Sequence, residues 1–235
     1  MTLTFVVTVL LFAVVIMPGC NNSPNSTKEM SIPRELEIPK NFDYGRWNGS
    51  TYRNDYFGFS ITKPNEWAFA GDEELKAIDQ DGAEIINSLR GDKKIVSEQD
   101  INLVEVMTAN LFLITRYSDE EDLDVEDFNP NIILKVQKNS IPGRDVVLDQ
   151  TEYVKAIRQG LSNVPGCVIK SQTNKTIGGQ EFTSLQGQLT FMDFVFSQEM
   201  LICFRNGYVM LFALTSFDDS EKIQLDDIMA TLKWD

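Results

Sequence analysis

The apolar residues of this chain recur in two patterns, one typical of helices and one typical of strands. Apolar positions three or four residues apart predict amphipathic helices over residues 72–90 and 149–163, and a last helix that opens at 218–220. Runs of β-branched and aromatic residues predict strands. These runs occupy residues 54–61, 106–117, 131–138, 167–173, 180–192, 199–205 and 208–216. No internal repeat is visible.

The last two predicted strands are joined by Asn206-Gly207, a pair typical of a tight hairpin turn, and a second turn is predicted over 174–179. Between residues 199 and 216, apolar side chains occupy both alternating sets of strand positions. A sheet with one face in water would alternate apolar and polar residues, so this sheet must be covered on both faces. The three helices can supply the covers. The predicted fold class is therefore α+β, a three-layer α/β/α sandwich with a mainly antiparallel central sheet.

A different pattern opens the chain, where residues 3–19 carry no charge and Cys20 follows at once. The apolar run over 3–17 is shorter than the roughly 18–20 residues that a membrane-spanning helix needs. An apolar core, a small residue, a cysteine and a polar segment, in this order, resemble a bacterial lipoprotein signal. The resemblance implies a signal peptide over 1–19, acyl chains such as palmitate on Cys20 and a flexible linker over 20–43, ahead of one domain over 44–235.

Two features differ from that signal. Met17 and Pro18 stand where a leucine and a small residue are usual, and no lysine or arginine precedes the apolar run. The alternatives are an uncleaved anchor and a secretory signal that is cut near Gly19 without lipidation. Lipidation of Cys20 predicts a protein held at the membrane of a bacterial cell envelope, facing the periplasm or the cell exterior.

Charge and composition narrow the function. The composition is 43% hydrophobic, as expected of a globular domain, and the net charge is −14, which repels nucleic acid phosphates. The chain has no histidine, which excludes Ser-His-Asp and Cys-His catalysis and most zinc sites. We therefore expect no nucleic-acid partner, no cofactor and no enzymatic activity.

The remaining candidate groups have simple interpretations. The acidic run over 118–128 holds seven carboxylates but lacks the glycine of an EF-hand loop, so it is either a solvated loop or a weak cation site. Cys167 and Cys203 are expected on separate strands of one sheet, as two buried free thiols or as a disulfide. The carboxylates that come closest to an acid–base pair are interpreted as surface groups. They are Glu105, Glu152, Glu181 and Glu199.

Residues 51–67 resemble the opening signature of the PsbP-like sandwich superfamily. The matching positions are Tyr52, Asn54, Gly58, Phe59, Ser60, Ile61, Pro64 and Trp67. The end of the chain is also similar to that family, with a strand ending in Thr215-Ser216 and a helix running into 230–234. The resemblance implies the sandwich fold over 44–235 and an accessory role, because the family includes DcrB-like envelope lipoproteins and has no general catalytic motif. Trp67 is interpreted as a packing anchor.

These observations predict a lipid-anchored envelope protein with a non-enzymatic binding or accessory role, whose partner is another envelope protein. The alternative is a lipoprotein that binds a small ligand or a divalent cation. Its site would be the acidic loop over 118–128 or a pocket between the sheet and a helix.

Overall fold

The computed structural model describes residues 38–39, 41–78, 108–118, 129–139, 149–162, 164–191 and 194–235. The predicted signal peptide, Cys20, most of the linker, the second half of the 72–90 helix and the acidic residues 119–128 lie outside this part of the chain. The described residues belong mainly to the domain that the linker is expected to carry.

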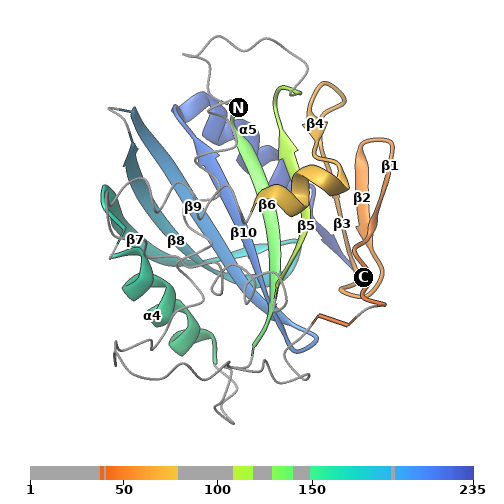
Figure 1. Ribbon diagram of the computed structural model, residues 1–235, viewed down its shortest axis with the longest axis horizontal. Helices are drawn as coiled ribbons and strands as arrows, with labels where there is room; N and C mark the ends of the chain where they lie inside the picture. The colour runs from red at the N-terminus through yellow and green to blue at the C-terminus, as the bar shows by residue number, and fades with distance from the viewer. Residues whose placement is uncertain are drawn as a thin grey trace, which may run out of the picture.

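The centre of the domain is a seven-stranded sheet in which every neighbouring pair of strands is antiparallel. Its order is β4-β5-β6-β10-β9-β8-β7 (Figure 1). The strands are β4 (Ala68–Phe69), β5 (Thr108–Thr115), β6 (Asn131–Lys138), β7 (Cys167–Ile177), β8 (Gln180–Phe191), β9 (Phe194–Arg205) and β10 (Tyr208–Ser216). The predicted antiparallel central sheet is confirmed.

Both predicted hairpins form, with two changes of length. Asn206 and Gly207 join β9 to β10 with φ angles of 52° and 77°, the left-handed conformation that a tight hairpin turn requires. The turn predicted over 174–179 is shorter in the structure, because β7 continues to Ile177 and only Gly178 and Gly179 remain in the turn. Strand β9 likewise begins at Phe194 rather than at 199, so the β8 and β9 pair is longer than predicted.

A second sheet of four short strands was not predicted as a sheet, although one of its strands overlaps the strand predicted over 54–61. It has the order β1-β2-β3-β11, formed by β1 (Arg46–Asn48), β2 (Thr51–Asn54), β3 (Phe59–Thr62) and β11 (Lys233–Trp234). The strand predicted over 54–61 is confirmed for residues 59–61, which lie in β3, but residues 55–58 form a turn, in which Gly58 has a φ of 62°. Trp234 pairs with Phe59, so the small sheet joins the two ends of the domain.

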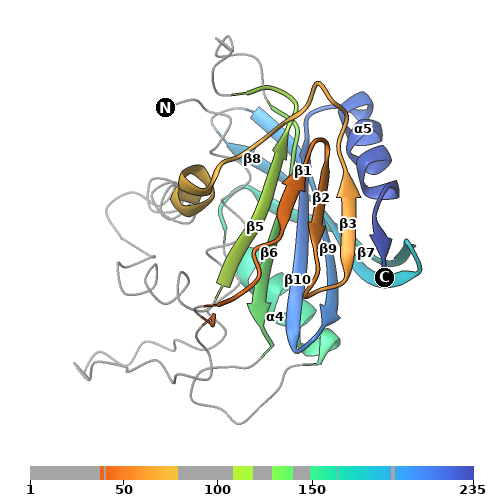
Figure 2. The same ribbon diagram turned by 90° about the vertical axis from the view of Figure 1, so that its right-hand side faces the viewer.

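Two layers cover the central sheet. Helix α4 (Gln150–Leu161) and the helical residues 72–78 pack on one face, where Tyr153, Ile157 and Ile78 are buried. Helix α5 (Asp219–Ala230) and the small sheet cover the other face (Figures 1 and 2). The α+β three-layer architecture is confirmed, with one outer layer that mixes a helix with strands.

Strand β10 shows why both covers are needed. All nine of its residues are buried. Met210 and Phe212 belong to the core under α5 and the small sheet, whereas Val209 and Leu211 belong to the core under α4. Burial on two faces follows from the apolar residues at both sets of alternating positions. Within the described ranges, no helix is long and apolar enough to cross a membrane.

Candidate functional site

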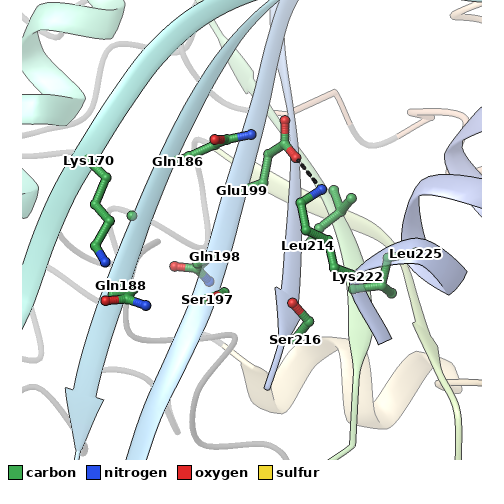
Figure 3. Close-up of a pocket in the computed structure, with 11 residues that line it drawn as sticks. Lys170, Gln186, Gln188, Ser197, Gln198, Glu199, Leu214, Ser216, Lys222 and Leu225 are labelled. Atoms are coloured by element: carbon green, nitrogen blue, oxygen red, sulfur yellow. Dashed lines mark hydrogen bonds and ion pairs between the residues drawn. The ribbon is translucent and has the colours of Figure 1, made fainter. Parts of the chain in front are cut away.

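A cavity of about 150 Å³ lies between the central sheet and α5. Strands β7, β8, β9 and β10 and helix α5 each contribute residues to its wall (Figure 3). The polar side chains that line it include those of Lys170, Gln186, Gln188, Ser197, Glu199, Ser216 and Lys222. This is a pocket between sheet and helix of the kind proposed from the sequence as one alternative binding site.

Glu199, on β9, is the charged group at the centre of this wall. Its side chain is only 5% exposed, so its interpretation as a surface carboxylate is wrong. Its Oε1 accepts a hydrogen bond of 2.6 Å from the Ser184 hydroxyl and forms an ion pair of 2.5 Å with the Lys175 amine. Its Oε2 lies 3.4 Å from the amine of Lys222 on α5 (Figure 3). Both carboxylate oxygens are therefore already occupied by groups of the protein.

These partners fix the charge of Glu199. Burial acts to raise the pKa of its carboxyl, but the hydrogen bonds from Lys175 and Ser184 and the charges of Lys175 and Lys222 outweigh burial and lower the pKa below its usual value. Glu199 is thus ionised at neutral pH. It is also a weak base, because a low pKa means a low affinity for a proton.

Lys170 reaches the cavity through an irregularity of the sheet. The register between β7 and β8 shifts between Ile169 and Ser171, so Lys170 is an extra residue on β7. Such a bulge changes the direction of a side chain. Here it places Lys170 in the cavity wall, on the same face of the sheet as Glu199. A Cβ on Gly187 of β8 would lie 2.9 Å from the Val168 carbonyl oxygen, so glycine at this position permits the bulge.

The charges of the wall are unevenly compensated. Lys175 is paired with Glu199, and Lys222 is paired with both Glu199 and Asp226, at 2.6 Å from the latter. Lys170 has no ion pair within the described ranges. The site therefore carries one ammonium group without a neutralising partner among these residues, in a chain whose net charge is −14.

The other candidates from the sequence do not enter this site. Cys20 and residues 119–128 lie outside the described residues, so the lipid-attachment site and the cation loop stay predictions. Cys167 and Cys203 are free thiols on β7 and β9, with β8 between these strands. Burial raises the pKa of the Cys203 thiol to about 12, which keeps it protonated and unreactive.

Several smaller predictions have definite outcomes. Trp67 is buried in the core, as its interpretation as a packing anchor requires. Glu152 and Glu181 are exposed, as predicted, and Glu105 lies outside the described residues. No group of three or more histidine, cysteine, aspartate or glutamate side chains that could hold a metal ion occurs in the described part of the chain.

The spacing of Glu199 from other carboxylates in the sequence gives no indication of its buried ion pairs. The available signal is its position within a strand. Glu199 falls on the same face of β9 as Leu201 and Cys203, which are core residues, so the strand period places it toward the interior.

No family model and no curated protein matches the sequence. Similar solved structures include cyanobacterial PsbP from Synechocystis sp. PCC 6803, with 11% identity, a TM-score of 0.45 and coverage of 92% of this chain and 100% of that one. They also include LpqN, described as involved in cell envelope biogenesis of Mycobacterium tuberculosis, with 15% identity, a TM-score of 0.42 and coverage of 79% and 84%. A PsbP structure is thus among the neighbours, as the resemblance over residues 51–67 implied. Because both TM-scores are below 0.5, neither likeness carries an argument about function.

Proposed function

We propose that this chain is a lipid-anchored cell-envelope protein that acts by binding and serves as an accessory subunit rather than as an enzyme. The observation that carries the proposal is the state of the charged groups around Glu199. Its two oxygens are occupied by Ser184, Lys175 and Lys222, and its lowered pKa keeps it from exchanging protons near neutral pH. A site of this kind can hold a ligand but lacks a group poised for general acid–base catalysis.

The thiols support the same conclusion. A nucleophilic cysteine needs a lowered pKa, whereas burial raises the pKa of both Cys167 and Cys203. With no histidine in the chain, neither thiol has the usual base to activate it. Screening the protein against ester, phosphoester and glycoside substrates tests this part, and turnover that survives purification would overturn it.

The lipid anchor rests on the lipoprotein-like start of the sequence. Acylation of Cys20 would hold the domain at the membrane, although its acidic surface is not attracted to anionic lipid head groups. Two or more acyl chains are needed for stable anchoring. Mass spectrometry of the mature N-terminus tests this. An intact Met1, or a cut elsewhere with an unmodified Cys20, would exclude the anchor.

The edge of β7 supports binding to another protein. Strand β7 is 11 residues long, ends the sheet order, and pairs only with β8 within the described ranges. An exposed edge of this length can accept an additional strand from a partner. Its charged residues are Lys170 and Lys175. Lys175 is paired with Glu199, whereas Lys170 has no ion pair among the described residues, so we propose as partner an extended segment of an envelope protein that carries an acidic side chain.

Site-specific crosslinking in the cell tests the β7 interface. A photoreactive residue at Val168, which is 57% exposed on β7, should give a discrete adduct with one envelope protein. The matched control is Ile223, which is 61% exposed and belongs to α5 rather than to β7. Equal adducts at both positions, or none at Val168, would argue against this surface.

A second candidate function is the binding of a small ligand, and the cavity beside Glu199 favours it specifically. The ammonium group of Lys170 lies in its wall without an ion pair among the described residues. The cation version of the sequence-based alternative is less compatible with this cavity, because the Glu199 oxygens are occupied by cationic groups. Calorimetry with calcium tests whether residues 118–128 supply a cation site instead.

A further inference from the structure

We infer that the cavity between the sheet and α5 binds a small organic carboxylate, and that Lys170 supplies the charge that recognises it. This inference rests on the second candidate function, the binding of a small ligand. The charge, the hydrogen-bonding groups and the size of the cavity each support it.

The charge of the cavity selects an anion. The part of the cavity wall that the structure describes contains one carboxylate, Glu199, which is compensated by Lys175 and Lys222. Lys170 is the lysine of the wall that has no ion pair among the described residues, and it enters the cavity from the side opposite Lys222 (Figure 3). An added negative charge would pair with Lys170, whereas an added positive charge would meet Lys170, Lys222 and a carboxylate whose oxygens are already occupied.

The same geometry disfavours a zwitterion such as a free amino acid. Its carboxylate would be satisfied by Lys170, but its ammonium group would need an acceptor of negative charge. Among the described residues that line the cavity, the only carboxylate is that of Glu199, and both of its oxygens already bind protein groups. An amino acid would therefore have to displace a lysine, at the cost of leaving that lysine unpaired.

The remaining groups of the wall suit a short organic acid. Gln186 and Gln188 on β8 carry amides, and Ser216 on β10 carries a hydroxyl, so the wall offers several hydrogen-bond donors (Figure 3). Leu214 and Leu225 supply an apolar portion of the wall, which a carbon chain can contact and an inorganic anion cannot. A volume of about 150 Å³ is below the roughly 300 Å³ at which pockets for drug-sized ligands begin, so the ligand is small.

The β7 bulge gives the site a structural origin. Lys175 and Ile177 contact groups on the α5 side of the sheet, so regular alternation counted back from them would direct residue 170 to the face that α4 covers. The bulge between Ile169 and Ser171 interrupts that alternation and brings Lys170 to the cavity instead. Bulges of this kind occur preferentially where a strand must re-aim a functional side chain.

The test is calorimetry on the full-length chain in detergent micelles, with acetate, propionate and L-lactate as probes. We expect saturable heat with at least one of them at millimolar concentration. Lys170→Gln should weaken that binding about threefold to fivefold, because Lys170 is exposed and water screens part of its attraction to the carboxylate. Lys155→Gln on α4 is the matched control, since Lys155 is exposed and carries the same charge on the other face of the sheet, and it should leave binding unchanged.

Several outcomes would overturn the inference. One is the absence of heat with all three acids, and another is an equal loss of affinity in the Lys170→Gln and Lys155→Gln proteins. Inorganic phosphate binding as tightly as propionate would contradict the role of the carbon chain. L-alanine binding as tightly as propionate would contradict the selection against a zwitterion. A failure of these tests leaves crosslinking at Val168 unaffected, so the inference and the proposed protein-binding function are judged separately.

Discussion

Replacing Glu199 by glutamine tests the charge network at the centre of the candidate site. Glutamine has almost the same shape and can still accept the hydrogen bond from Ser184, but its amide nitrogen cannot accept from a lysine. The variant therefore loses the attraction to Lys175, at 2.5 Å, and to Lys222, at 3.4 Å. A hydrogen bond between charged groups contributes about 1.5–3 kcal/mol when it is well shielded from water.

The expected loss is smaller than the full value of two ion pairs. The side chains of Lys175 and Lys222 are 33% and 38% exposed, so water recovers part of their solvation when the carboxylate is removed. We therefore expect Glu199→Gln to lower the free energy of unfolding by about 2 kcal/mol at pH 7. The assay is urea unfolding followed by far-UV circular dichroism, with an unchanged dependence on urea concentration as the sign that only stability has changed.

The pH dependence has a definite sign. The pKa of Glu199 is lower in the folded state than in the unfolded chain, so its stabilisation is present above the unfolded pKa of about 4.3 and is lost as the pH falls through the folded pKa. The difference between the wild type and Glu199→Gln should therefore be largest near neutral pH and shrink below about pH 4.

Two controls make this prediction refutable. Glu181→Gln makes the same chemical change at an exposed position of β8 and should alter stability by less than about 0.5 kcal/mol. The double variant Ser184→Ala with Glu199→Leu removes the buried hydroxyl and the carboxylate together, and it should recover most of the lost stability because neither position then holds an unpaired buried polar group. A Glu199→Gln protein as stable as the Glu181→Gln protein, or a double variant less stable than Glu199→Gln, would refute the reasoning.

Three further predictions concern the turn, a thiol and the core. Gly178→Ala should lower the free energy of unfolding by about 2–4 kcal/mol, because φ is +58° and the new Cβ would lie 2.4 Å from the Leu232 carbonyl oxygen. Gly179→Ala, whose new Cβ would meet no atom within 4 Å, should lower it by only about 1–2 kcal/mol, and thermal or urea unfolding measures both changes. The Cys203 thiol, with its pKa raised to about 12 by burial, should not react with Ellman's reagent at pH 8 in the native protein and should react fully in denaturant. Phe212→Ala should cost about 3–5 kcal/mol in urea unfolding, since this ring is fully buried between the sheet and its cover.

The sequence determined the fold class because burial leaves a local pattern. Apolar residues on both faces of β10 are sufficient to require two covering layers, and Asn206-Gly207 is sufficient to place the hairpin that carries them. Helices α4 and α5 can be predicted for a similar reason, since Asp149 and Asp218 cap them and accept hydrogen bonds from Glu152 and Glu221 at 2.8 Å and 2.7 Å.

Apart from the strand predicted over 54–61, the small sheet is not visible in the sequence, because its strands are short and the pairing of β11 is not local. Strand β11 is two residues long and pairs with β3, which lies more than 160 residues earlier in the chain. Hydrophobic periodicity needs a longer window than two residues, so the sequence pattern places Lys233 and Trp234 at the end of a helix. Only the packing of the two ends of the domain against one another reveals a strand there.

The candidate site was decided by tertiary structure for the same reason. Glu199 and Lys222 belong to a strand and a helix, and neither the ion pair between them nor the Lys175 contact has a sequence signature. The bulge that aims Lys170 depends on the register between two strands, which the sequence does not specify residue by residue. The amino-acid order alone thus determined which surfaces must be buried, because hydrophobicity is a property of each residue, whereas the charges that meet in the cavity were set by how the layers pack.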